Sequence, residues 1–150
     1  MIASGLPFHE FGMMAAKDYF FDNAKRKKFV SLFMQILPME RKPNRTEITN
    51  NVDLCRQMRC NLILFPEGTR SKTGQLQKLK KGAAYFAQSL QMPLVPVHIR
   101  GTFESLPKGR NFPLPKRISV TIGKPVYVKQ EGLLGLREAT QELETRIKQL

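Results

Sequence analysis

Four consecutive residues, Glu67-Gly68-Thr69-Arg70, combine the side chains and the backbone freedom that an anion-binding loop needs. The guanidinium of Arg70 carries a planar set of donors that suits the oxygens of a phosphate, and the Thr69 hydroxyl adds another. Gly68 allows backbone conformations closed to other residues and lets a ligand approach the backbone closely. The alternative is a solvated turn in which Glu67 pairs with Arg70. The residue types alone therefore indicate either a phosphate-binding loop or an ordinary surface turn.

A short apolar run, Leu62-Ile63-Leu64-Phe65, precedes these four residues and is followed directly by Pro66. Such a run predicts a buried β-strand that ends at the proline, since proline has no N–H to donate to a neighbouring strand. Ligands of open α/β sheets bind beyond the carboxyl ends of the strands. The strand is therefore expected to present the loop at a ligand-binding edge.

The seven residues Phe65-Pro66-Glu67-Gly68-Thr69-Arg70-Ser71 resemble the acceptor-binding motif of the glycerolipid acyltransferases, the lysophosphatidic acid acyltransferase family. Two other blocks of the family occur in the expected order, one before and one after these seven residues. Pro38-Met39-Glu40-Arg41 resembles the block in which an arginine helps to hold the acceptor phosphate. Val95-Pro96 resembles the block that shapes the acyl-chain side of the pocket. The resemblance is continuous from Ala15 to Pro125.

The resemblance implies an α/β layered domain with a central mixed β-sheet flanked by helices, and it assigns roles to single residues. Arg41 and Arg70 would clamp the acceptor phosphate, and Glu67 would orient Arg70 or contact the acceptor. Lys80 matches the lysine of a Lys-x-Gly-Ala stretch that follows the motif. The substrate-binding residues implied in this way are Arg41, Glu67, Gly68, Thr69, Arg70, Lys80 and Pro96.

The implied reaction is transfer of a fatty acyl group to the free hydroxyl of a lysophospholipid such as 1-acyl-glycerol-3-phosphate, in phospholipid biosynthesis. The implied partners are this acceptor and an acyl thioester donor, carried on coenzyme A or acyl-carrier protein. No metal and no tightly bound cofactor is implied. The two arginines would hold the hydroxyl in line for attack, and positioning of this kind contributes strongly to rate.

The family's catalytic motif, Asn-His followed after four residues by Asp, does not occur in these 150 residues: Met14 stands five positions after His9, and Phe103 five positions after His98. In the family the His removes the proton of the acceptor hydroxyl and the Asp orients the imidazole. Met1–Pro7 resembles the segment that follows the motif's Asp. We therefore expect that the sequence begins inside the domain, after the catalytic segment, and that these residues alone are inactive.

The chain is strongly basic, with 25 Lys and Arg residues, 12 Asp and Glu residues and a net charge of +13 in 150 residues. This excess implies an acidic counterpart, such as an anionic membrane surface, a phosphate-bearing substrate or nucleic acid. Nucleic acid is not expected, because the basic residues are scattered among turns and no known nucleic-acid motif accompanies them. The length suits one domain covering residues 1–150.

Cys55 and Cys60 lack the spacing of a metal-binding C-x-x-C pair, and the chain has only two histidines. The two cysteines are expected to be core or helix-face thiols in a reducing compartment. No apolar run approaches the ~20 residues that a membrane-spanning helix needs. We therefore expect a cytoplasmic protein that lies peripherally at the inner face of a membrane.

Hydrophobic periodicity and turn residues predict the elements that position the motif. Strands are predicted at residues 12–16, 62–65, 92–101 and 117–123, the last half-buried, and helices at residues 24–37, 44–60, 77–90 and 132–150. The helix over residues 24–37 begins with Lys25-Arg26-Lys27-Lys28 and continues with an apolar run. It fits a core helix and a membrane-surface helix equally well. The alternative function is therefore a non-catalytic basic module that binds lipid or a membrane.

Overall fold

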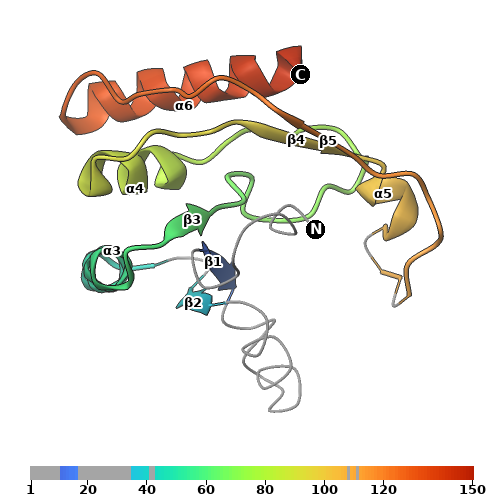
Figure 1. Ribbon diagram of the computed structural model, residues 1–150, viewed down its shortest axis with the longest axis horizontal. Helices are drawn as coiled ribbons and strands as arrows, with labels where there is room; N and C mark the ends of the chain where they lie inside the picture. The colour runs from blue at the N-terminus through green and yellow to red at the C-terminus, as the bar shows by residue number, and fades with distance from the viewer. Residues whose placement is uncertain (1–10, 17–34, 41–42, 108, 111) are drawn as a thin grey trace. The chain divides into compact units, whose positions relative to one another are not determined.

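The fold is described by a computed structural model that covers residues 11–16, 35–40, 43–107, 109–110 and 112–150 (Figure 1). The chain divides into two compact units, Met1–Phe65 and Pro66–Leu150. In the described residues, the first unit holds three strands and a helix, and the second holds three helices and two strands. Each unit combines helices with a sheet, so the predicted α/β class is confirmed.

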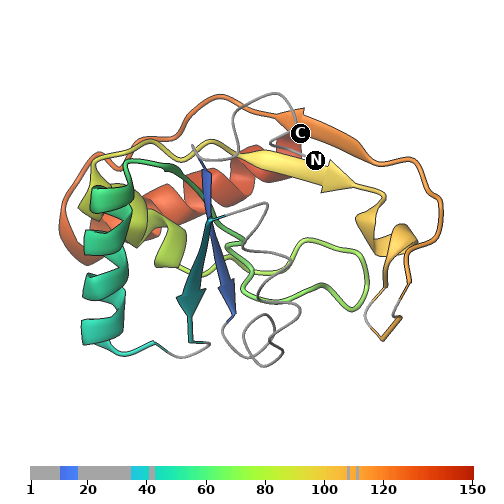
Figure 2. The same ribbon diagram turned by 60° about the horizontal axis from the view of Figure 1, so that its bottom comes forward.

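The first unit is built on a parallel sheet with the strand order β2-β1-β3. Strand β1 (Phe11–Ala16), close to the strand predicted at residues 12–16, pairs with β2 (Gln35–Met39) and with β3 (Asn61–Ile63). Figure 2 shows β1 and β2 side by side. A Cβ at Gly12 would lie 3.0 Å from Cys60 Sγ, so this glycine allows the close packing beside the central strand.

The prediction of a helix over residues 24–37 is wrong at its carboxyl end, where the chain forms strand β2. The backbone of β2 pairs in parallel with β1, from Gln35 opposite Gly12 to Met39 opposite Ala16. An apolar run of this length suits a buried strand as well as a helix, and pairing with β1 decides between them. Pro38 is tolerated because β2 lies at the edge of the sheet. Residues 17–34, including the basic cluster of the predicted helix, lie outside the described residues.

Helix α3 (Arg45–Met58) corresponds to the helix predicted at residues 44–60. It is capped by Asn44, whose Oδ1 accepts a hydrogen bond from the Glu47 N–H at 2.8 Å. Cys55 and Cys60 are free and buried, as predicted for core thiols. Burial, with a smaller contribution from neighbouring Cys60, raises the pKa of the Cys55 thiol to about 11. Cys55 is therefore protonated and unreactive at neutral pH.

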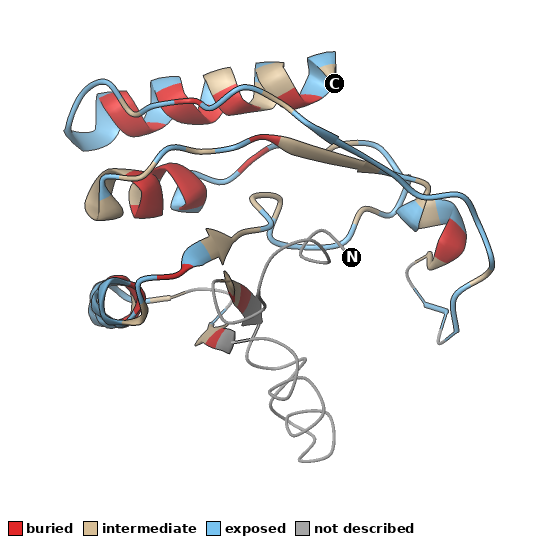
Figure 3. Cartoon of the chain, viewed as in Figure 1, coloured by how far each residue is buried: buried red, intermediate tan, exposed pale blue. Residues whose placement is uncertain are grey.

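The core of the second unit lies between α4 (Gly82–Leu90) and α6 (Gly132–Gln149). Figure 3 shows buried residues recurring along one side of α6. Two clusters of buried side chains join the helices to their surroundings: Leu79 with Leu143 and Ile147, and Ala84 with Leu136 and Ala139. The amphipathic stripe predicted for residues 132–150 is therefore confirmed. None of the described helices has the length and apolar character needed to cross a membrane.

Strands β4 (Val97–Arg100) and β5 (Ser119–Ile122) form an antiparallel pair, connected through the short helix α5 (Thr102–Ser105) and a loop. The half-buried pattern predicted for residues 117–123 is wrong, because all four residues of β5 are exposed. In the described part of the chain β5 pairs only with β4, and the buried clusters on α4 and α6 contain no β5 residue. Alternating apolar residues in this strand therefore remain in contact with solvent.

Gly101→Ala is expected to destabilise the second unit. Gly101 has φ +86°, and a Cβ there would collide with the backbone carbonyl of Arg117. The left-handed conformation alone costs a residue with a Cβ about 1–2 kcal/mol. Gly82→Ala is the matched control, since nothing lies within 4 Å of a Cβ at that position and alanine favours a helix. Urea unfolding followed by circular dichroism should show a lower midpoint for Gly101→Ala only, and equal midpoints would contradict this turn geometry.

Candidate functional site

The Glu67–Arg70 motif lies in a loop, residues 66–81, that two hydrogen bonds close at its base. The Lys80 N–H donates to the Pro66 carbonyl oxygen at 2.8 Å. The Gln77 N–H donates to Glu67 Oε2, also at 2.8 Å. One carboxylate oxygen of Glu67 therefore holds the loop closed. The sequence did not suggest this role; orienting Arg70 and contacting an acceptor stay predictions.

The strand predicted at residues 62–65 is shorter and less buried than expected. Strand β3 ends at Ile63, where its pairing with Met13 of β1 ends, and Phe65 is 59% exposed. Leu62 and Ile63 are only half-buried, because β3 lies at an edge of the sheet and has one strand neighbour in the described residues. The chain therefore leaves the sheet two residues before Phe65, and the loop follows from Pro66.

The helix predicted over residues 77–90 begins only at Gly82, because the preceding residues close the loop. Leu79 is 5% exposed and packs against Leu143 and Ile147 of α6. Its neighbours Lys78 and Lys80 are exposed, and the Lys80 N–H is bonded to Pro66 rather than to a helical carbonyl. This non-helical stretch turns Leu79 into the core and Lys80 out of it.

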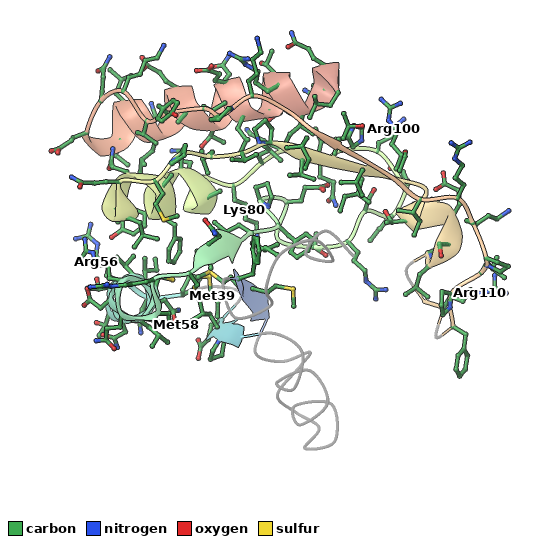
Figure 4. All side chains as sticks on the ribbon, viewed as in Figure 1. Met39, Arg56, Met58, Lys80, Arg100 and Arg110 are labelled. Carbon is green, nitrogen blue, oxygen red and sulfur yellow. The ribbon has the colours of Figure 1, made fainter. Side chains whose placement is uncertain are left out.

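Lys80 lies directly beside Gly68 of the motif. A Cβ at Gly68 would lie 2.6 Å from Lys80 Nζ and 3.0 Å from its Cε, so the lysine side chain occupies space that another residue at this position would need. Gly68 also has φ +70°, a conformation that favours glycine. Figure 4 labels Lys80 next to the loop that follows β3. The motif thus has an ammonium group against its own backbone.

The outer part of the loop is ordered by hydrogen bonds between residues two positions apart in the chain. Ser71 Oγ accepts a hydrogen bond from the Thr73 N–H at 3.2 Å, and Thr73 Oγ1 accepts one from the Gln75 N–H at 3.4 Å. Thr69 and Arg70 are exposed just before these turns. A cation and a hydroxyl are therefore accessible to a ligand, next to the Lys80 ammonium at Gly68. The structure brings Glu67, Gly68 and Lys80 together, with Thr69 and Arg70 adjacent to them in the same turn.

Two of the predicted site residues are not placed in this cluster. Arg41, like His9, lies outside the described residues. Pro96 is fully buried, and its carbonyl oxygen accepts a hydrogen bond from the Gly123 N–H at 2.8 Å. A Cβ at Gly123 would lie 2.9 Å from Pro96 Cγ. The contacts described for Pro96 therefore hold the start of β4 against the segment that follows β5.

Sequence reasoning missed Gln77, and no signal in the sequence could have found it, because its role in the loop uses only its backbone N–H. Its side-chain Nε2 is buried and has no hydrogen-bond partner in the described part of the chain. The same is true of His98 Nδ1 on β4. Within the described ranges, no group of three or more His, Cys, Asp or Glu side chains is arranged to hold a metal ion.

Residues 3–100 match a family model described as Acyltransferase. The chain belongs to the acyltransferase family. The chain is 33% identical over 105 residues to the chloroplastic 1-acyl-sn-glycerol-3-phosphate acyltransferase BAT2 of Brassica napus, covering 67% of the chain and 30% of that protein. It is 29% identical over 99 residues to the 1-acyl-sn-glycerol-3-phosphate acyltransferase of Pseudomonas aeruginosa, covering 65% of the chain and 38% of that protein. The chain thus spans about a third of the length of these relatives.

The chain also has the fold of a solved structure, the 1-acyl-sn-glycerophosphate acyltransferase PlsC of Thermotoga maritima. The TM-score is 0.68 at 22% identity, and the match covers 94% of this chain and 56% of that one. The resemblance drawn from the seven residues Phe65–Ser71 is confirmed by the family match, and the predicted α/β arrangement by the shared fold.

Glu67→Ala is expected to open the loop formed by residues 66–81 without unfolding the helices. A hydrogen bond to a charged group contributes about 1.5–3 kcal/mol, so losing it should speed hydrogen exchange of the Gln77 amide about tenfold or more. Glu131→Ala is the matched control, because Glu131 precedes α6 and makes no side-chain hydrogen bond to cap it. Amide exchange measured by NMR checks this. An unchanged Gln77 rate in Glu67→Ala would contradict the role of the carboxylate.

Proposed function

We propose that the protein containing these residues transfers a fatty acyl group from a thioester to the hydroxyl of a lysophosphatidate, and that residues 66–81 bind the acceptor phosphate. One observation above all supports this. The Lys80 ammonium lies beside Gly68 in the closed loop, and the two residues that follow Gly68, Thr69 and Arg70, are exposed. Guanidinium, ammonium and hydroxyl groups together suit a phosphate. Membership of the acyltransferase family and the names of its relatives support the reaction.

The proposed chemistry needs little beyond positioning and one proton transfer. The acceptor oxygen loses its proton and bonds to the thioester carbonyl carbon, the carbon–sulfur bond breaks, and the sulfur takes up a proton and leaves as the thiol of coenzyme A or acyl-carrier protein. Arg70 and Lys80 would bind the phosphate and so hold the hydroxyl in line for this attack. We propose Arg41 as the second arginine of the clamp. Pro96, through the packing that fixes the start of β4, would shape the acyl-chain side.

We further propose that the protein works at an anionic membrane surface, peripherally and on the cytoplasmic side. The net charge of +13 supports attraction to anionic headgroups, and a lysophosphatidate acceptor would lie in that surface. The same features support a second candidate function, a lipid-binding module that shares the phosphate site but performs no transfer. Both candidate functions predict binding of the lysophosphatidate, and only the first predicts acyl transfer to it.

Arg70→Ala is expected to weaken binding of a short-chain, water-soluble lysophosphatidate by about tenfold or more, because hydrogen bonds to charged groups contribute about 1.5–3 kcal/mol. Isothermal titration calorimetry measures this directly. Arg137→Ala is the matched control, since it removes the same charge from an exposed position on α6. A monoacylglycerol, which lacks the phosphate, should not bind. Equal affinities for Arg70→Ala and Arg137→Ala would overturn the assigned phosphate site.

Turnover by the 150 residues alone is expected to be ~100- to 10,000-fold below that of an acyltransferase with a general base, since we assign this role to none of them. Neither His9 nor His98 has an Asp five positions later. Release of the coenzyme A thiol from an acyl-coenzyme A, with lysophosphatidate as acceptor, measures the rate. The Pseudomonas aeruginosa relative serves as the reference enzyme. Rates similar to the reference would contradict this expectation and exclude the purely lipid-binding candidate.

A further inference from the structure

Residues 105–130 combine basic charge with exposed apolar side chains. The segment carries six Lys and Arg residues and no Asp or Glu. It also contains five of the large apolar residues that the structure leaves exposed, namely Phe112, Ile118, Val120, Ile122 and Tyr127. Phe112 is the extreme case, at 80% exposed. Apolar side chains that gather on a surface together with charge are typical of a binding surface.

The loop that carries Phe112 is held together without any contribution from that ring to the core. The Leu114 N–H donates to the Ser105 carbonyl oxygen at 2.7 Å, and Ser105 Oγ donates to the Leu114 carbonyl oxygen at 2.8 Å. Within the loop, Gly109 has φ +100° and the Arg110 N–H donates to the Pro107 carbonyl oxygen at 3.1 Å. Because Phe112 stays in solvent while the loop is ordered at its base, packing does not account for an aromatic residue here.

The exposed apolar residues of β5 lie on one side of the strand. Val120 is paired with Ile99 and Ile122 with Val97, while Ser119 and Thr121 are paired with Arg100 and His98. Side chains of directly paired residues lie on the same face of a sheet. One face of the β4–β5 pair is therefore apolar, and at β5 it is open to solvent, with Ile122 63% exposed.

The loop that carries Phe112 begins next to the candidate phosphate site. A Cβ at Gly74, in the outer turn of residues 66–81, would lie 3.0 Å from Phe103 Cδ1 of α5. Figures 1 and 2 both show this outer turn reaching α5, and the loop with Phe112 follows α5 directly in the chain. A partner that bound the loop with Phe112 would therefore also come close to the turn that follows Arg70.

We propose that this part of the chain is the surface by which the protein docks on an anionic lipid bilayer. The docking surface consists of Arg110, Phe112, Lys116, Arg117, Val120 and Ile122. Phe112 and the open side of β5 enter the boundary between headgroups and acyl chains, and the three cations lie among the lipid phosphates. The inference rests on the proposed function for its orientation, because docking here brings the phosphate loop to a lipid acceptor. Nucleic acid would match the charge but leave the exposed aliphatic side chains without a partner.

A single introduced fluorophore tests insertion directly, because the chain has no tryptophan. Phe112→Trp should show a blue-shifted emission with vesicles of phosphatidylcholine and phosphatidylglycerol, and brominated lipid should quench it. Leu133→Trp is the matched control, since Leu133 is 69% exposed on α6 and lies outside the docking surface. Its emission should not change. Equal responses of the two variants, or no response of Phe112→Trp to vesicles that bind the chain, would overturn the proposal.

Vesicle flotation measures the contribution of each part of the docking surface. Phe112→Ser should weaken binding about tenfold, and each of Arg110→Gln and Arg117→Gln about fivefold, with the effect of charge falling as salt rises. Leu133→Ser and Arg137→Gln should bind like the unaltered chain. Circular dichroism melting checks that every variant folds. Unchanged binding by folded Phe112→Ser, or equal losses in the controls, would overturn the proposal.

The two proposals fail in different ways. Phe112→Ser should bind soluble short-chain lysophosphatidate normally, whereas Arg70→Ala should lose that binding but still bind phosphatidylglycerol vesicles. Normal lysophosphatidate binding by Arg70→Ala would remove the phosphate site and leave the docking surface in place. A DNA duplex that displaces the chain from vesicles, with an affinity that Phe112→Ser does not change, would instead identify a nucleic-acid surface and overturn docking on lipid.

Discussion

The closure of one loop by Glu67 and Lys80 is the constraint on which the candidate site depends. The Glu67 carboxylate accepts the Gln77 N–H, and the Pro66 carbonyl accepts the Lys80 N–H. With both ends tied, Leu79 turns into the core of α4 and α6 while the Lys80 side chain lies along Gly68. If residues 77–81 continued α4 instead, the Lys80 N–H would bond to a helical carbonyl and Lys80 would leave the motif. The position of a positive charge therefore depends on a carboxylate elsewhere in the same loop.

Some apolar residues of the second unit are buried in its core, and others are exposed to solvent. Leu143 and Ile147 of α6 are buried and pack against Leu79 of the loop, while Leu136 of α6 is buried against Ala84 of α4. Phe112 and the residues of β5 remain in solvent, although their composition would suit a core. In the described residues β5 has β4 as its one partner strand and all four of its residues are exposed, so its apolar side chains are not buried within their own unit. The same local geometry that makes β5 a poor core strand makes it available to a partner.

The parts of the fold that sequence reasoning predicted well are those set by neighbours along the chain. The α6 stripe, the α3 helix and the strand at β1 follow from spacing within one segment, and all three were found close to their predicted bounds. The errors lie where a distant segment decides. Residues 35–39 form β2 because β1 accepts them as a partner, and residues 77–81 stay out of α4 because Pro66 and Glu67 bond to them. For the candidate site, the motif was visible in the sequence, but the part played by Gln77 was not.

By itself, the sequence determined the chemical character of this chain: a Glu-Gly-Thr-Arg motif, a large positive charge and membership of the acyltransferase family. These follow from the kinds of residues and their order, which need no folding to be recognised. Only the tertiary structure decided that Glu67 closes the loop, that Lys80 reaches Gly68, and that Phe112 and β5 stay exposed. The reason is physical. Burial and hydrogen-bond partners are supplied by residues from other segments of the chain, and no local pattern of side chains specifies which residues those will be.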